Sequence, residues 1–301
     1  MNVAHSTRQT PEIAERTRRS PVPKYALWAA VMIAPFLLLT AVGMIAPVIL
    51  LVVQSVSGPH GFTLDYIVSL SSPTYRLAAW NSILLSFASA SLALVTGGLV
   101  ALIAFGSDAH PRLGAIVTSF SAVTANFAGV PLAFAFISTL GMFGLLTRVL
   151  RVAGIDIYAM GFSLYSMSGL TLVYTYFLMP LMVILITPAI RAISQDWLAA
   201  AKSLGANPSQ QFRLVALPIL APSLVSAFIL LFGSAFSGYA TAYALTSGNI
   251  VLLTTEIGNV LTGDVTSAPQ TGAALSVAMI VTMAVLVWIS RWFGRRTRRW
   301  K

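Results

Sequence analysis

Six long segments that are nearly free of charged residues alternate with short polar stretches along the chain. Each segment supplies the roughly 20 helical residues that cross a hydrocarbon core of about 30 Å. None shows the strict apolar and polar alternation of a barrel strand, so the pattern predicts helices, which satisfy their own backbone hydrogen bonds in lipid. The predicted spans are Tyr25–Val56, Asn81–Phe105, Ala115–Thr139, Leu164–Ala189, Ile219–Leu245 and Thr271–Trp292.

The expected fold is therefore all-α, a polytopic membrane helix bundle of about six transmembrane helices. Prolines 35, 47, 131, 180 and 222 lie in or near the spans, where they predict kinks and not interruptions. The first span is too long for the core of a signal peptide. We therefore expect three parts: a disordered basic tail at 1–24, a transmembrane domain at 25–293 and a second basic tail at 294–301.

The basic residues indicate the orientation of the bundle. With six spans, both tails and the loops at 107–113 and 190–217 lie on one side, and this side holds 15 of the 18 Lys and Arg residues. Only Arg76, Arg148 and Arg151 fall on the other side. Since basic loops stay in the cytoplasm, both termini and these loops are predicted to be cytoplasmic, in a multi-pass protein of the plasma (inner) membrane.

Composition excludes several other classes of protein. Hydrophobic residues make up 57% of the chain and charged residues only 9%, too few for the surface of a soluble domain. The net charge of +10 is concentrated in tails that flank apolar spans, which favours a bilayer over nucleic acid as the partner. There is no cysteine, no phosphate-binding loop and no ligand spacing among His5, His60 and His110. We therefore expect no catalytic residue, no metal and no cofactor bound by this chain.

The connection between the fourth and fifth spans is too long for a simple link and carries helix signals of its own. Asp196 is the predicted cap of a helix over 197–204, which Gly205 ends by adopting a positive φ. Asn207 is the predicted cap of a second helix that has Pro208 in its first turn. The sequence therefore predicts a helix, a glycine turn and a second helix in the loop between the fourth and fifth spans.

This loop resembles the hallmark E-A-A-x-x-x-G-x9-I-x-L-P motif of the inner-membrane permease subunits of importer-type ABC transporters. In that family the short helix is the coupling helix, which inserts into a cleft of a separate ATPase. The resemblance implies a hydrophobic fit by Leu198, Ala201 and Leu204. The residues at the motif positions are Ala200, Ala201, Gly205, Leu217 and Pro218, with Val215 in place of Ile and Ala199 in place of Glu.

The resemblance also implies a set of partners. They are a pair of ATPase subunits that use ATP, a second permease subunit in a heterodimer or homodimer, and an extracytoplasmic solute-binding protein. The remainder of the chain looks like the spermidine/putrescine-type branch, and substrates of similar permeases include polyamines, iron, thiamine and phosphonates. Two alternatives to an ABC permease remain open at this point: a membrane anchor that transports nothing, and an ion-coupled secondary transporter. The lack of ionisable groups within the spans weakens the second.

Polar residues within the spans are candidates for a solute pathway, although each is also able to join helices by hydrogen bonds. Small residues recur every four positions at Ser89, Ala93, Gly97 and Ala101, and again at Ser234, Gly238 and Ala242, which predicts close helix packing. The candidate pathway residues are Asn126, Tyr174, Tyr176, Ser237, Tyr239, Thr241 and Tyr243.

Overall fold

The computed structural model describes residues 24–58, 61–106, 111–262 and 269–297, and it divides into two compact units. The first unit covers residues 1–50 and contains most of helix α1 (Lys24–Ser55), which continues without a break through Pro35 and Pro47. The second covers residues 51–301 and holds every other described element. Residues 1–23 of the tail predicted at 1–24 lie outside the described residues, and Lys24 begins α1. Residues 294–297, predicted as tail, continue the last helix.

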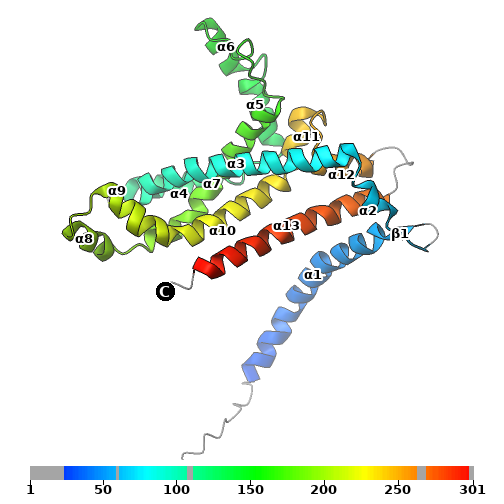
Figure 1. Cartoon of the computed structure of the whole chain (residues 1–301), viewed down its shortest axis with the longest axis horizontal. Coiled ribbons are helices and arrows are strands. Elements are labelled where there is room, and N and C mark those ends of the chain that lie inside the picture. The colour runs from blue at the N-terminus through cyan, green and yellow to red at the C-terminus, as the bar shows by residue number, and fades with distance from the viewer. Residues whose placement is uncertain (1–23, 59–60, 107–110, 263–268, 298–301) are drawn as a thin grey trace, which may run out of the picture. The chain divides into compact units, whose positions relative to one another are not determined.

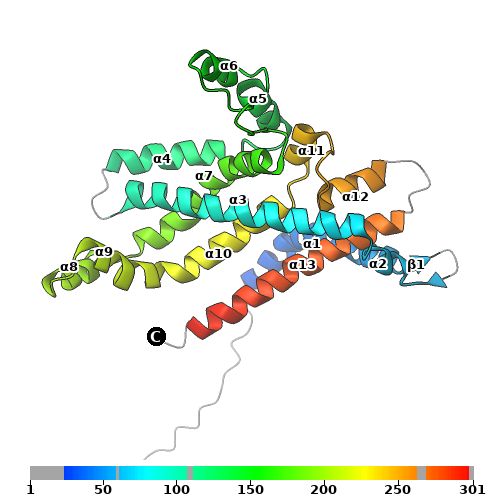
Figure 2. The ribbon, with the colours of Figure 1, turned by 45° about the horizontal axis from the view of Figure 1, so that its top comes forward.

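In the second unit, three long helices that pack side by side form the centre of the bundle (Figures 1 and 2). They are α3 (Pro73–Phe105), α7 (Met167–Arg191) and α10 (Leu217–Phe236), and α13 (Pro269–Thr297) packs against α10. Two antiparallel strands of two residues each precede them. The remaining elements are β1 (Ser57–Gly58), β2 (Gly61–Phe62), α2 (Asp65–Ser69), α4 (Pro111–Thr124), α5 (Val130–Leu140), α6 (Leu145–Val152), α8 (Gln195–Ser203), α9 (Pro208–Gln211), a π-helical turn (Phe212–Ala216), α11 (Ala240–Thr246) and α12 (Leu253–Thr262).

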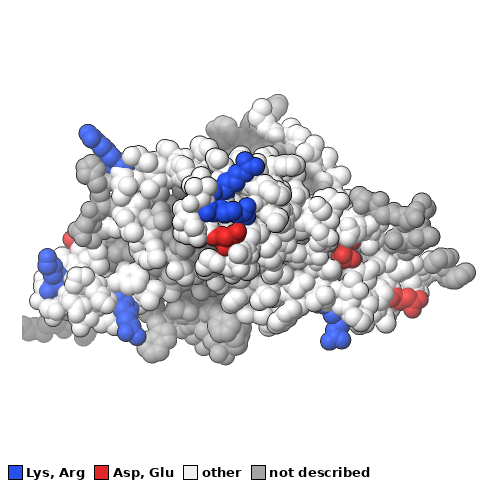
Figure 3. Space-filling model, turned by 90° about the horizontal axis from the view of Figure 1, so that it is seen from above, with Lys and Arg blue, Asp and Glu red and all other residues white. Residues whose placement is uncertain are grey.

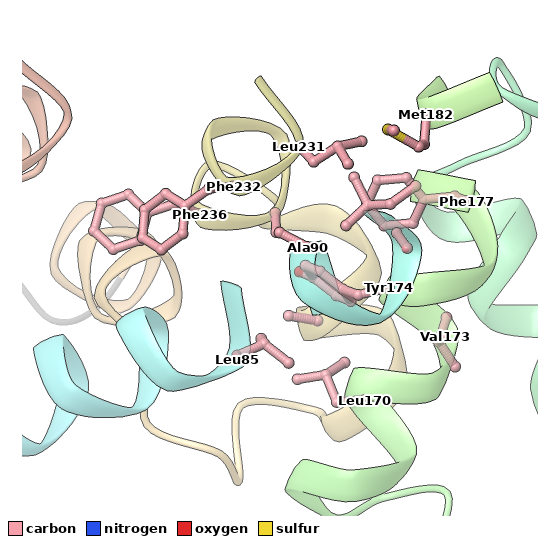
Figure 4. Packing of buried hydrophobic residues seen from close by; sticks show 14 of the residues in the cluster. Leu85, Ala90, Leu170, Val173, Tyr174, Phe177, Met182, Leu231, Phe232 and Phe236 are labelled. Atoms are coloured by element: carbon pink, nitrogen blue, oxygen red, sulfur yellow. The ribbon is translucent and has the colours of Figure 1, made fainter. Parts of the chain in front are cut away.

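The core lies where α3, α7 and α10 meet (Figure 4). The predicted small-residue stripe on α3 is confirmed, because Ser89, Ala93, Gly97 and Ala101 are all buried. A Cβ built on Gly97 would lie 2.6 Å from the Met179 carbonyl oxygen and 2.8 Å from Met182 Cβ. The missing side chain thus lets the α3 backbone approach α7.

Helices long and apolar enough to cross a membrane number six among the described residues, as the sequence predicts. The face seen in Figure 3 is mostly uncharged, with one group of basic and acidic side chains near its centre and the other charges toward its ends. The apolar spans in the structure are Val31–Ser55, Pro73–Phe105, Val130–Val152, Met167–Arg191, Pro208–Phe236 and Pro269–Ile289.

Two predicted spans are wrong in their continuity. The third, at 115–139, is broken at 125–129, where Gly129 has φ 75°, and Pro131 lies in the first turn of α5 instead of kinking a longer helix. The fifth, at 219–245, is broken at 237–239 between α10 and α11. The second small-residue stripe is divided by this break, so Ser234, Gly238 and Ala242 do not lie on one helix.

Candidate functional site

The loop predicted to couple to an ATPase projects at one end of the bundle, where α8 and α9 lie (Figure 2). The cap of α8 is Ser194, whose Oγ accepts a hydrogen bond from the Asp196 backbone N–H at 3.2 Å, so the prediction of Asp196 as the cap is wrong. Gly205 has φ 83°, which confirms the predicted glycine turn. The turn closes through the Ala206 N–H, which donates to the Ala201 carbonyl at 3.0 Å.

The second half of the loop is joined to the bundle without a break. Asn207 and Gln210 form a reciprocal capping box at 2.9 Å, which confirms Asn207 as the cap of α9. A π-helical turn then leads into α10, and the Leu217 N–H donates to the Phe212 carbonyl. Pro218 has no N–H and would crowd the carbonyl four residues earlier in a regular helix. The wider turn thus accommodates the proline, and one rod runs from Pro208 to Phe236.

The α8 helix has two different faces. At 3.6 residues per turn, Gln195, Leu198, Ala199 and Lys202 share one side, and all four line a pocket of the chain itself. On the opposite side, Trp197 and Ala200 follow one line with Leu204, the C-cap of α8, and all three are exposed. Trp197 is 51% exposed and Leu204 is 89% exposed. Large apolar side chains so exposed beside a polar loop are typical of an interaction surface.

The predicted coupling residues do not all lie on the same side of the loop. Leu204 and Ala200 lie on the outer face, whereas Leu198 and Ala199 lie on the pocket face, and Ala201 is half-buried at the boundary. Ala199, at the position of the motif's Glu, therefore borders the chain's own pocket. Farther along, Val215 is half-buried, and Leu217 and Pro218 are exposed near the start of α10.

Trp197 is an exposed residue that lies outside the sequence motif. The motif begins at Ala199, so it makes no prediction about position 197. The signal that finds it is the spacing of positions 197, 200 and 204, which fall on one line of a 3.6-residue helix. Trp197 thus adds a large exposed ring to the outer face.

A second polar region lies where the two helix breaks meet. Thr241 Oγ1 accepts a hydrogen bond from the Gly129 N–H at 3.0 Å, and α5 packs against α11. The Tyr174 hydroxyl donates to the Gly238 carbonyl, in the segment between α10 and α11. These bonds satisfy backbone groups that the interrupted helices leave without partners. Thr241 and Tyr174 therefore join the helices, and Tyr174, fully buried, lines no open pathway in this structure.

The other candidate pathway residues are exposed on the chain. Tyr239 and Tyr243 stack with ring centroids 5.3 Å apart beside α12, and Tyr176 meets Phe136 edge to face at 5.2 Å. A Cβ on Gly258 of α12 would lie 2.7 Å from the Tyr239 ring, so this glycine makes room for the tyrosine. Asn126 and Ser237 are also exposed, one at each helix break. The structure thus brings Tyr239, the N-cap of α11, together with Tyr243 of that helix.

Comparison of the chain with known proteins shows the family to which it belongs. The model of the binding-protein-dependent transport system inner membrane component matches residues 20–299, nearly the whole chain. The chain belongs to this family. It is the non-catalytic permease subunit of a binding-protein-dependent ABC transporter and a multi-pass inner-membrane protein, so the membrane-anchor and secondary-transporter alternatives are set aside.

Among the relatives of this permease, the spermidine/putrescine transport system permease protein PotB of Haemophilus influenzae is 25% identical over 232 residues. That match covers 75% of this chain and 78% of PotB. The trehalose transport system permease protein SugB of Mycobacterium tuberculosis is 33% identical over 121 residues, or 40% of this chain and 44% of SugB. A bacterial ABC transporter that imports the acidic polysaccharide alginate shares the fold, with TM-score 0.70 and 17% identity over 90% of this chain and 96% of the other.

Proposed function

We propose that this permease forms half of a solute pathway and couples it to a separate ATPase through the outer face of α8. The observation that carries the proposal is the exposed line of Trp197 and Ala200 on α8 and Leu204 at its C-cap, with α8 capped by Ser194 and ended by the turn at Gly205. This surface suits insertion into an apolar cleft of a partner. The continuous rod from Pro208 to Phe236 then offers a direct mechanical link to α3 and α7.

In this proposal, two ATPase subunits close on ATP and move the coupling loops of two permease subunits, which form a heterodimer or a homodimer. A solute-binding protein on the other side of the membrane delivers the solute. One structure of similar fold is a bacterial alginate ABC transporter in complex with an alginate pentasaccharide-bound periplasmic protein, which supports such a partner. The relatives are named for polyamine, trehalose and molybdenum transport. This diversity supports a binding protein that selects the solute, with polyamines, iron, thiamine and phosphonates as candidates.

The test of docking places a charge on the outer face. Leu204→Asp would bury a carboxylate without a partner when the ATPase binds, a cost of several kcal/mol. We expect the ATPase retained in a pull-down to fall more than about tenfold, while the amount of permease in the membrane stays the same. Ser203→Asp is the matched control, because it adds the same charge at an exposed position outside the line of Trp197 and Leu204. Equal loss in both variants, or in neither, would refute docking through this face.

We further propose that the loop and both termini are cytoplasmic and that Asn126 and Tyr239 face the pathway. The support is the 15-to-3 distribution of basic residues and the exposure of the two side chains. Since the chain has no cysteine, a single cysteine introduced at Ser209, Asn126 or Tyr239 is the only thiol in each variant, so its labelling reports the accessibility of that position. A membrane-impermeant thiol reagent added outside should label positions 126 and 239 in at least one transport state, and position 209 only in inverted vesicles. Labelling of position 209 from outside would reverse the orientation.

A further inference from the structure

The pocket behind α8 has an apolar floor and a basic rim. Its volume is about 680 Å³. Leu102 and Phe105 of α3 and Ile190 of α7 contribute apolar surface, and Gln195, Lys202 and Gln211 contribute polar groups. A volume of this size is typical of a site for a small ligand or for part of a larger one.

Charge in and around this pocket favours an anion. Among the described residues that line it, Lys202 is the charged one, and the others are apolar or uncharged. Arg191 adds a second positive charge nearby, with its guanidinium 4.9 Å from the centre of the Phe105 ring. Asp196 belongs to the same helix but does not line the pocket.

The position of the pocket favours a ligand that also has an apolar part. Leu102, Phe105 and Ile190 lie in the last turns of the spans Pro73–Phe105 and Met167–Arg191, where the hydrocarbon core gives way to the polar loop. Lys202 lies beyond that boundary, on α8. The pocket therefore extends from the edge of the bilayer to the loop, with its positive charge on the loop side.

We infer that this pocket binds an anionic phospholipid, with the phosphate at Lys202 and the start of an acyl chain against Leu102 and Phe105. Basic pockets between membrane helices are recognised sites for anionic head groups. The ATPase is a poorer fit as occupant, because its proposed surface at Trp197 and Leu204 lies on the opposite side of α8. The inference concerns the inner face of α8 alone, so it does not depend on ATPase docking.

A bound lipid would hold α8 against α3 and α7. The pocket has walls on α8, α9 and the π-helical turn as well as on the long helices. Occupancy would therefore reduce the freedom of the loop relative to the bundle. Ala199 matters here, because its small side chain leaves this space open on the pocket face.

The experiment compares lipid retention by the purified full-length chain in detergent, measured by native mass spectrometry. The probes are phosphatidylglycerol and phosphatidylcholine with identical acyl chains. Lys202→Gln removes the charge, and Ala199→Phe fills the pocket without changing charge. The matched controls are Arg213→Gln on the same loop and Ala200→Phe on the outer face, neither of which lines the pocket.

Phosphatidylglycerol retention should fall about fivefold in Lys202→Gln, as expected for the loss of one basic residue at an anionic head group. It should fall at least as far in Ala199→Phe and stay unchanged in both controls. Phosphatidylcholine should bind weakly to all five proteins. Equal retention of the two lipids, or equal phosphatidylglycerol retention by all five proteins, would overturn the inference.

Two further arms separate the lipid from other occupants. Glycerol 3-phosphate carries the anionic group without an acyl chain and should not displace the lipid at equal concentration. Displacement would mean a site for small anions and would overturn the lipid assignment. In the complex with the ATPase the lipid should be retained, whereas its release on ATPase binding would assign the pocket to the ATPase. Docking itself is judged separately, by Leu204→Asp.

Discussion

Gly97 and Gly98 are neighbours on α3, yet the structure predicts opposite responses to the same substitution. A Cβ at position 97 would lie 2.6 Å from the backbone carbonyl oxygen of Met179, which cannot swing aside, and 2.8 Å from Met182 Cβ. A Cβ at position 98 would meet only the flexible end of Met182, at 3.8 Å. The contact at position 98 is an ordinary van der Waals contact, whereas the contacts at position 97 would force α3 away from α7.

The magnitude follows from two opposing terms. Replacing Gly by Ala within a helix stabilises it by about 1 kcal/mol. Overpacking a close helix contact costs about 1–3 kcal/mol. We therefore expect Gly98→Ala to be stabilising or neutral and Gly97→Ala to be less stable than Gly98→Ala by about 1–3 kcal/mol. For a protein of this size, that difference corresponds to roughly 2–12 °C in the unfolding midpoint.

The assay is thermal unfolding of both variants and the unaltered chain in one detergent, followed by the loss of the monodisperse peak on size-exclusion chromatography. Uptake in vesicles should fall with Gly97→Ala if the α3–α7 contact also serves transport. Equal midpoints for the two variants, or a higher midpoint for Gly97→Ala, would show that α3 and α7 do not approach each other at Gly97 as described.

Two further predictions concern single backbone positions. Gly205→Val should strain the turn after α8 by ~1–2 kcal/mol and reduce ATPase retention, whereas Gly205→Asn should retain most of it, because Asn tolerates a positive φ (83° here); a pull-down that ranks Val above Asn would contradict this. Thr241→Val should remove the acceptor for the Gly129 N–H and lower stability by about 1–3 kcal/mol, whereas Thr241→Ser should restore it. Thermal unfolding in detergent measures this effect, and equal midpoints for Val and Ser would exclude a role for the hydrogen bond.

The number of spans and the family are determined by the sequence alone. Long apolar runs are required wherever a helix crosses lipid, so hydropathy finds them without knowledge of the packing. The turn at Gly205 and the cap at Asn207 are local, because glycine tolerates a positive φ and the Asn side chain bonds its own backbone. The spacing from Ala200 to Pro218 carried the family resemblance for the same reason, since it reflects a locally folded loop.

Only the tertiary structure decided where the apolar runs stop being helical and which way their side chains face. The breaks at 125–129 and 237–239 are short and lie inside long stretches without charge, so hydropathy does not separate them from the spans. Contacts between distant groups such as Thr241 and Gly129 satisfy the freed backbone. Tyr174 is a polar residue on an apolar span in sequence, but it is fully buried and its hydroxyl donates to the distant Gly238 carbonyl, so it is part of the core (Figure 4). Likewise, 3.6-residue periodicity groups Ala199 with Lys202 and Trp197 with Leu204. Which group faces inward depends on packing against the end of α7 and against the end of α3, which lies far away in the chain.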